Sequence, residues 1–234
     1  MSALENNHWQ IVPATKIYEI FHKVVKLPEF EVVGRNLLAK QVSTDLVHLV
    51  NLAAYKGALY GLRWGVSLSY VPHRWEKELR WHRSLKSARL DLFDEPMDLP
   101  PTLNLAKQPL DQFAPCALHG PEAFERDLTR EWQILHNTIT SWFERVADLH
   151  GILAMSEEQM ERSWTGPHHW PPPSLIHSFT LARMGNLERA TKELQNITDT
   201  GVHETKFPPP EGSGEGVILI CRLERPMVSL HRAA

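Results

Sequence analysis

The spacing of hydrophobic and polar positions changes along the chain, and each change marks a predicted element. Residues 14–27 carry apolar side chains three or four positions apart, which predicts a helix that ends at Pro28. Residues 31–42 are rich in β-branched side chains at their start and predict a strand. Residues 45–54 are apolar on both faces, which predicts a central strand. Residues 59–71 alternate most closely and give the best-defined strand.

The two faces of the 59–71 strand differ in size. One face carries large side chains, namely Tyr60, Leu62, Trp64, Val66, Leu68 and Tyr70. The other is small and flat apart from one arginine, with Gly61, Arg63, Gly65, Ser67 and Ser69. Because glycine weakens a strand interior unless something packs closely on it, one interpretation is a helix or loop seated on the glycines. The alternative is a binding surface with Arg63 at its centre.

The second half of the chain is predicted to be mostly helical. Residues 94–121 contain six prolines and predict a loop. Residues 121–150 repeat apolar positions every three or four residues and predict a long helix. A capping box over Ser156–Gln159 predicts a short helix over 156–164, and a helical hairpin is predicted over 174–197.

These elements predict an α+β fold: a mostly antiparallel sheet packed against an N-terminal helix and a C-terminal helical layer. Short strands are also predicted near 87–93 and at 217–223. We expect a single domain over 1–234, with a sheet-containing part over 1–95 and a helical part over 120–200. The 217–223 strand is expected to return to the sheet, because a short strand is rarely stable alone.

Composition and charge exclude several classes of protein. The chain is 42% hydrophobic and 23% charged, with 8 Trp and 8 Phe, which is typical of a globular protein with a sizeable core. The net charge of -3 does not point to any particular class of partner. We expect no membrane span and no signal peptide. The two cysteines, Cys116 and Cys221, predict reduced thiols and a cytoplasmic location, with one long-range disulfide as the alternative.

A basic segment with interleaved tryptophans is the first candidate for binding chemistry. Its basic residues recur every third position: Arg74, Lys77, Arg80, Arg83, Lys86 and Arg89. Trp75 and Trp81 lie among them, and basic plus aromatic side chains are typical of sites for single-stranded nucleic acid. A period of three drifts by about 60° per step around a helix, so the alternative is a solvated helix with no single basic stripe.

Candidate catalytic and metal-ligating groups are scattered. No phosphate loop, dinucleotide fingerprint or zinc-peptidase motif is present. The densest group among the 13 histidines is His168 and His169, followed by His177, with acidic residues upstream at Glu157, Glu158 and Glu161. Adjacent histidines in a proline-rich loop rarely ligate one ion, so we expect no metal and no cofactor. Cys116 and His119 form a Cys-x-x-His pair with no orienting third group.

The order of parts up to Phe93 resembles a bacterial family, domain of unknown function 4304. The resemblance lies in the 14–27 helix, in Gly34-Arg35-Asn36, in the 46–52 run Leu-Val-His-Leu-Val-Asn-Leu, in the 60–70 strand and in the 88–92 run Ala-Arg-Leu-Asp-Leu. It covers the first half to two-thirds of the chain, and Ala53-Ala54-Tyr55 departs from it. The family has no known catalytic residues to carry over. The resemblance implies that relatives of this chain are found near bacterial toxin–immunity systems.

The sequence therefore favours a non-enzymatic protein-binding module, an immunity-type or regulatory partner in a bacterium, with another protein as its partner. One alternative is a hydrolase that uses a metal or a dispersed histidine and carboxylate site. The other is single-stranded nucleic-acid binding through the Arg74–Arg89 segment. The candidate binding residues are Arg63, Arg74, Trp75, Arg80, Trp81 and Arg83.

Overall fold

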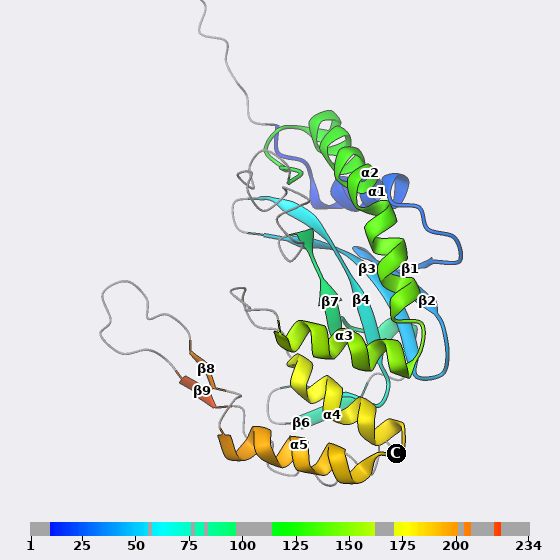
Figure 1. Ribbon diagram of the computed structural model, residues 1–234. Coiled ribbons are helices and arrows are strands. Elements are labelled where there is room, and N and C mark those ends of the chain that lie inside the picture. Colours follow the sequence, from blue (N-terminus) through cyan, green and yellow to red (C-terminus); the bar gives the residue numbers. More distant parts are fainter. Residues whose placement is uncertain are drawn as a thin grey trace, which may run out of the picture. The chain divides into compact units, whose positions relative to one another are not determined.

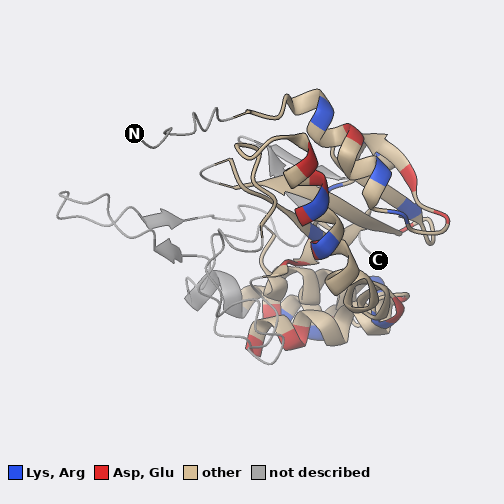
Figure 2. Ribbon diagram, turned by 90° about the horizontal axis from the view of Figure 1, so that it is seen from above, with Lys and Arg blue, Asp and Glu red and all other residues tan. Residues whose placement is uncertain are grey.

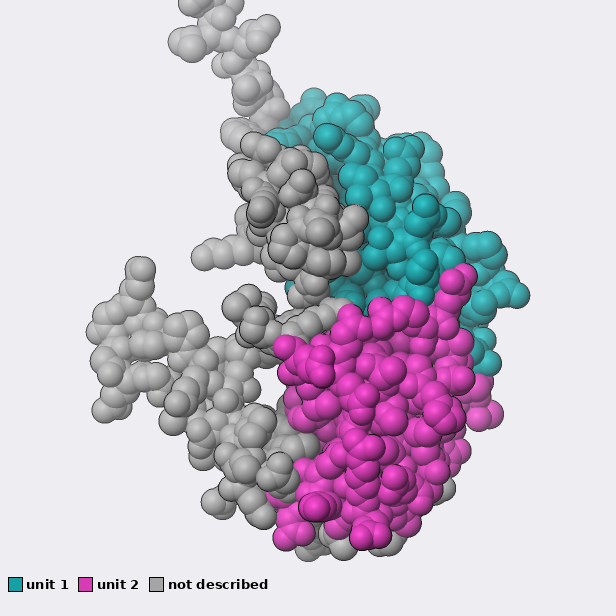
Figure 3. Space-filling view, in the orientation of Figure 1, with its two compact units in different colours: residues 1–42, 47–66, 93–143 teal, residues 43–46, 67–92, 144–234 magenta. Residues whose placement is uncertain are grey.

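A computed structural model describes residues 10–55, 58–75, 78–81, 84–96, 114–161, 171–200, 204–206 and 218–220 of the chain. These residues fold as an α+β protein with five α-helices and a five-stranded antiparallel sheet, as the sequence predicts. The chain divides into two compact units, coloured separately in Figure 3. Unit 1 contains residues 1–42, 47–66 and 93–143, and unit 2 contains residues 43–46, 67–92 and 144–234. The sequence predicted a single domain, and each unit is described by itself below.

The five-stranded sheet has the order β1-β2-β3-β4-β7 (Figure 1). Its strands are β1 (Glu31–Gly34), β2 (Leu37–Gln41), β3 (Leu46–Ala54), β4 (Tyr60–Leu68) and β7 (Leu92–Asp94). β3 is central and almost entirely buried on both faces, which confirms the prediction for residues 45–54. The strand predicted near 87–93 is shorter and begins later, as β7, and a 3-10 helix, Leu85–Ser87, ends at its predicted first residue.

The predicted strand 31–42 is instead a hairpin, because the chain turns at Arg35 and Asn36 between β1 and β2. Asn36 holds this turn against β3 of unit 1. Its side-chain amide donates to the Leu52 carbonyl at 3.1 Å, and its own carbonyl accepts from the Leu52 amide at 2.9 Å. An asparagine at a turn satisfies backbone groups that would otherwise be left unpaired, which explains why the strand breaks there.

Unit 1 also contains α1 (Ala14–Val24) and α2 (Pro121–Arg145), which lie alongside each other and are joined by an ion pair between Lys23 and Glu125 (Figure 1). α1 ends three residues earlier than predicted. It buries the predicted apolar face, including Ile17 and Phe21, in the core. α2 buries its predicted stripe, with Phe124, Leu128, Leu135, Ile139, Trp142 and Phe143 inside.

The predicted single helix 121–150 is two helices, because α2 ends at Arg145 and α3 (Leu149–Glu161) begins four residues later in unit 2. Asp148 starts α3: its carboxylate accepts the Gly151 amide at 2.8 Å, as an N-cap does. A Cβ at Gly151 would lie 1.9 Å from the Arg145 carbonyl oxygen, so only glycine fits this turn. The predicted capping box at Ser156 is wrong, since Ser156 lies inside α3 and its hydroxyl donates to the Leu153 carbonyl.

The helical part of unit 2 is a stack in which α3 packs on α4 (Pro173–Arg183) and α4 packs on α5 (Leu187–Thr200). α4 and α5 form the predicted helical hairpin. Gly185 ends α4 with a φ of 85°, and the Asn186 amide donates to the Leu181 carbonyl in the Schellman pattern. α4 is buried nearly all round, which explains why its sequence shows no polar stripe.

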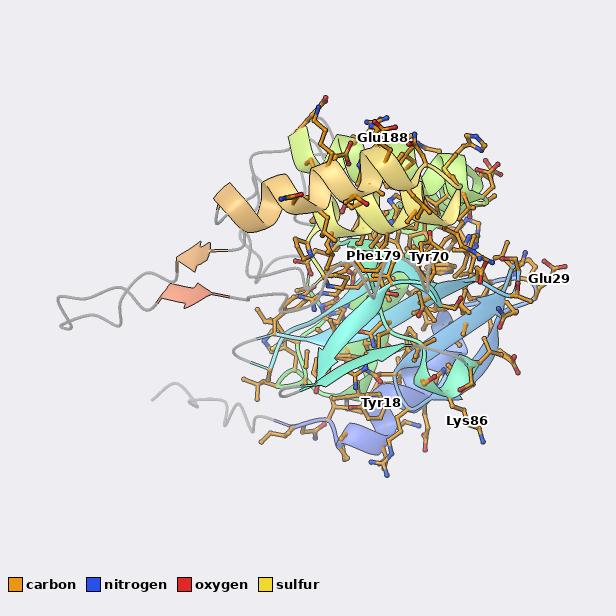
Figure 4. All side chains as sticks on the ribbon, turned by 90° about the horizontal axis from the view of Figure 1, so that it is seen from below. Tyr18, Glu29, Tyr70, Lys86, Phe179 and Glu188 are labelled. Carbon is orange, nitrogen blue, oxygen red and sulfur yellow. The ribbon has the colours of Figure 1, made fainter. Side chains whose placement is uncertain are left out.

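Within unit 2, α4 is held to the turns that flank the sheet strands. Arg183 pairs with Asp45 through Nε at 2.9 Å and through a terminal nitrogen at 2.8 Å, and Ser69 donates to the same carboxylate. The Tyr70 hydroxyl lies 3.2 Å from that of Thr180, and Figure 4 labels Tyr70 beside Phe179 in this packing.

Two small two-stranded sheets complete the described residues, and both correct sequence-based expectations. β5 (Pro72–Trp75) and β6 (Glu78–Trp81) form an antiparallel hairpin, so the solvated-helix interpretation of this segment is wrong. Aromatic and β-favouring residues on both sides of a two-residue connection explain the hairpin. β9 (Ile218–Ile220) pairs with β8 (Glu204–Lys206) instead of returning to the main sheet, because local pairing closes a shorter loop.

Candidate functional site

The arginine that the sequence singled out lies in a cluster within unit 1. Arg63, on β4, places its guanidinium carbon 5.2 Å from the centre of the Tyr55 ring and 5.5 Å from that of Phe93. Both distances are within the range of cation–π attraction. Tyr55 follows β3 and Phe93 belongs to β7, so the strands on both sides of β4 supply the rings. The Arg63 side chain is 29% exposed, which leaves part of it open to solvent.

Glu95 is the anion of this cluster, which we name the Arg63 cluster: Tyr55, Arg63, Phe93 and Glu95. The carboxylate lies directly after β7 and its residue is only 3% exposed. Oε2 accepts a hydrogen bond from Arg63 Nε at 2.5 Å and another from the Tyr55 hydroxyl at 2.9 Å. A buried carboxylate is tolerated because both partners are donors and one is charged.

The electrostatics of the cluster keep both Arg63 and Tyr55 in their usual protonation states. Burial lowers the pKa of Arg63, but hydrogen bonds and charge from Glu95 and Tyr55 outweigh it, and the pKa is raised overall. Burial first, and the charge of Glu95 second, also raise the pKa of Tyr55. The tyrosine therefore remains a hydroxyl donor and the arginine a cation over the physiological range.

A second carboxyl group, from Glu131 of α2, lies beside the cluster. Its Oε1 accepts the Leu62 amide of β4 at 3.0 Å, while Oε2 is buried and has no hydrogen-bond partner. Burial raises the pKa of Glu131 to about 8, although the hydrogen bond from Leu62 opposes the rise. A Cβ at Gly61 would lie 2.9 Å from the Tyr55 ring and 3.4 Å from Glu131 Oε1. Gly61 therefore makes room for the tyrosine and the carboxyl group.

The small face of β4 is covered, so it is not an open flat surface. Gly61 and Gly65 are buried and Ser67 is 2% exposed, while Arg63 is the partly exposed member within β4. The interpretation that something packs on the glycines is confirmed at Gly61, where Tyr55 and Glu131 do so. The binding role of Arg63 stays a prediction, now limited to the exposed part of one side chain.

Four of the other predicted binding residues lie on the β5–β6 hairpin of unit 2. Arg74 and Trp75 lie on β5, and Arg80 and Trp81 lie on β6, where the register pairs Arg74 with Leu79 and His73 with Arg80. Arg83 lies outside the described residues. Nucleic-acid binding by the Arg74–Arg89 segment stays a prediction, and its signature is salt-dependent binding to single strands.

One histidine of the predicted metal group forms a buried cluster in unit 2. His177 of α4 is 3% exposed, and its Nε2 lies 3.0 Å from Glu157 of α3 while its Nδ1 lies 2.6 Å from Glu193 of α5. Arg189 donates to the other oxygen of Glu193 at 2.8 Å. The two carboxylates face opposite ring nitrogens, so one ion bound to the imidazole cannot contact both. Three helices are instead tied to one side chain.

The remaining candidate catalytic and metal-ligating residues lie partly within and partly outside the described residues. Cys116 is a buried free cysteine, and the His119 amide donates to its carbonyl at 3.3 Å. His168, His169 and Cys221 lie outside the described residues. Among the residues that the structure describes, no group of three or more His, Cys, Asp or Glu side chains has a metal-binding arrangement.

A shallow hollow of about 520 Å³ lies along the outer face of α2 in unit 1. Its lining residues share one helix face and carry both charges: Glu122, Glu125, Arg126, Thr129, Arg130 and Gln133. Figure 2 shows the red of acidic residues and the blue of basic residues mixed along the ribbon of this helix. Mixed charge favours no ligand of a single sign, so this hollow is a weaker candidate than the Arg63 cluster.

Sequence reasoning missed the partners of Arg63. Tyr55 was assigned to a turn, and Glu95 and Glu131 were assigned no role beyond their segments. The one signal that pointed to them was Gly61, because glycine inside a strand marks a close approach by another group. Glycine alone does not say which group that is: Glu131 lies 70 residues from Gly61, and Glu95 lies 32 residues from its partner Arg63.

No α-helix within the described ranges is long and apolar enough to cross a membrane. Comparison of the chain with protein-family models, with curated proteins and with solved structures gives no match. The resemblance to domain of unknown function 4304 therefore stays a prediction, and the function is argued from the site.

Proposed function

We propose that this chain is a non-enzymatic protein-binding module in which Arg63 anchors the partner protein. The observation that supports the proposal is that Arg63, a partly exposed cation, is held in place by its neighbours. The guanidinium lies over two aromatic rings and donates through Nε to the buried Glu95, while 29% of the side chain remains exposed.

Such an arginine is well suited to be an interface anchor. Arginine and tyrosine are enriched among the residues that carry most of the binding energy at interfaces. A free arginine loses about 2 kcal/mol of rotamer entropy when it is fixed, and Arg63 is already held by its rings and by Glu95. Nε is used within the cluster and the guanidinium also interacts with Tyr55, so we expect the exposed part of the fork to donate to a carboxylate or carbonyl of the partner.

The wider setting belongs to the same proposal. An immunity-type or regulatory role in a bacterium follows from the family resemblance, and a cytoplasmic location follows from cysteine usage. The buried free thiol of Cys116 suits a reducing compartment.

Affinity capture with matched variants tests the proposal. The tagged chain, Arg63→Lys and Arg183→Lys are used to capture partners from the native cell, and the captured proteins are quantified by mass spectrometry. Lysine keeps the charge beside Glu95 but loses the planar fork that lies on Tyr55 and Phe93. Arg183 is the matched control, because its side chain is 34% exposed and pairs with a carboxylate, that of Asp45 in unit 2, and it is not a member of the Arg63 cluster.

We expect one stoichiometric protein partner whose recovery falls by about tenfold or more with Arg63→Lys, which corresponds to about 1.4 kcal/mol. Recovery with Arg183→Lys should match that of the unchanged chain, and circular dichroism should show all three folded. Capture of no partner, or equal recovery with Arg63→Lys, would overturn the proposal.

A further inference from the structure

Glu131 makes a side-chain contact with the backbone in the middle of a strand. Its Oε1 accepts the amide of Leu62, which lies within β4, at 3.0 Å. Glu131 belongs to α2, so this hydrogen bond joins a helix to a strand of unit 1 through one carboxyl group. Gly61 allows the approach, because a Cβ there would already lie 3.4 Å from Oε1.

The second oxygen of Glu131 is buried with no donor. The titratable group that faces this carboxyl is Tyr55, just after β3, and its hydroxyl is bonded to Glu95, as is Arg63 of β4. On α2 itself, Asp127 lies four residues before Glu131 and pairs with Arg126. The pKa of Glu131 is shifted by burial and by the Leu62 amide, and by no charged group among the described residues, so a negative charge on the buried Oε2 would be uncompensated.

We propose that the hydrogen bond between Glu131 and Leu62 is a proton-controlled latch between α2 and β4 of unit 1. It is closed while the carboxyl carries a proton, because a neutral carbonyl oxygen accepts the Leu62 amide and no charge is buried. The latch opens when the proton is lost to solvent, because the carboxylate is then hydrated by water when it leaves the buried position. The residue as a whole is half-buried although Oε2 is buried, so part of Glu131 already reaches solvent.

The latch is expected to act close to physiological pH. Burial raises the pKa of Glu131 to about 8, so modest alkaline changes alter its charge. The latch is independent of the proposed binding function and is tested without a partner.

Amide hydrogen exchange of Leu62 measures the latch directly. The full chain is studied by NMR from about pH 6.5 to 9.5, and each rate is divided by the intrinsic rate at that pH. We expect the protection of Leu62 to fall by about tenfold or more between pH 7 and 9. The amide of Leu52 is the control in the same unit, because it donates to the backbone carbonyl of Asn36 at 2.9 Å and that acceptor does not titrate.

Two variants separate the effect of protonating Glu131 from the effect of its hydrogen bond to Leu62. Glu131→Gln keeps a neutral acceptor for the Leu62 amide, so its protection should not change with pH. Glu131→Ala has no acceptor, so its Leu62 amide should exchange quickly at every pH. Constant protection of Leu62 in the unchanged chain, or an equal fall in Glu131→Gln, would overturn the latch.

A direct titration keeps the proposal testable if either variant fails to fold. The carboxyl carbon of Glu131 in the unchanged chain is followed by NMR from about pH 3 to 10. A midpoint above about pH 6.5 that coincides with the loss of Leu62 protection supports the latch. A midpoint near the ordinary value for glutamate, about 4.3, contradicts it.

Discussion

The ring of Tyr55 occupies the space that a side chain at Gly61 would need. A Cβ built on Gly61 lies 2.9 Å from Tyr55 Cε2, which is closer than carbon atoms approach in folded proteins. The tyrosine can therefore reach Glu95 with its hydroxyl while its ring lies beside Arg63. Glycine normally destabilises a strand interior, but at position 61 its missing side chain is what allows Tyr55 to join the Arg63 cluster.

The first prediction concerns this glycine. Gly61→Ala should lower the free energy of unfolding by about 1–3 kcal/mol, because the added methyl group forces the Tyr55 ring to shift in a packed core. Gly34→Ala on β1 is the control: its Cβ would lie 3.6 Å from Leu37 Cβ, an ordinary contact. Urea denaturation measures both changes. Equal effects for the two substitutions would show that Tyr55 is not fixed against β4.

The second prediction is the effect of pH on stability through Glu131. Its pKa of about 8 in the folded chain lies above the unfolded value of 4.5, so the folded state binds more protons between these values. The contribution of Glu131 to stability is therefore fully present below about pH 4.5 and is lost as the pH rises toward 8. Glu131→Gln removes this loss and should be more stable than the unchanged chain at pH 8.5 by roughly 1–3 kcal/mol.

The comparison is made by urea denaturation at several pH values, and its sign is the decisive result. The difference between Glu131→Gln and the unchanged chain should grow from pH 5 to 8 and then level off. Glu122→Gln, also on α2, should show no such growth, because it lies in the first turn and is not buried. A difference that shrinks as the pH rises would contradict the prediction.

The third prediction concerns His177 in unit 2. His177→Ala removes the group that bonds Glu157 of α3 and Glu193 of α5, and leaves both carboxylates without it. Because the glutamates are partly exposed, water compensates in part, and we expect a loss of about 1–3 kcal/mol in the free energy of unfolding. Thermal or urea denaturation followed by circular dichroism measures it.

His150→Ala serves as the control for that experiment, since His150 is exposed and lies in the first turn of α3. Its effect should stay within about 0.5 kcal/mol. If both substitutions cost the same, the bonds of His177 to the two glutamates add nothing to the stability of the three helices.

The fourth prediction compares two tryptophans of unit 1. Trp142 donates from Nε1 to the buried Asp94 at 2.8 Å, whereas Nε1 of Trp64 is buried without an acceptor. Both lose the same volume on substitution by phenylalanine. Trp142→Phe should therefore cost about 1–3 kcal/mol more than Trp64→Phe, because only Asp94 loses a donor. Denaturation of the two variants side by side measures the difference, and an equal or reversed order would contradict it.

The apolar run of residues 45–54, the alternation of 59–71 and the spacing in 121–150 were enough to predict an antiparallel sheet with helices. Those patterns follow from the burial of one or both faces of an element, and the order of apolar and polar residues along that element shows it directly. Breaks were harder to predict. The turn at Asn36, and the start of α3 at Asp148, depend on single side chains that satisfy backbone groups.

The site shows the same division. Sequence identified Arg63 because a lone arginine on a strand of small residues is visible in the alternation itself. It identified neither Tyr55, Glu95 nor Glu131 as its neighbours, because no local pattern encodes which distant side chain fills the space beside a glycine.

Sequence by itself thus determined the α+β class, the central place of β3 and the apolar faces of α1 and α2, since these follow from the hydrophobic effect acting at fixed periods. Tertiary structure decided the pairing of β9 with β8, and the meeting of Tyr55, Arg63 and Glu95. Those outcomes depend on loop closure and on the desolvation of charges. Both are set by which segments come together in space, and not by the residues at any one position.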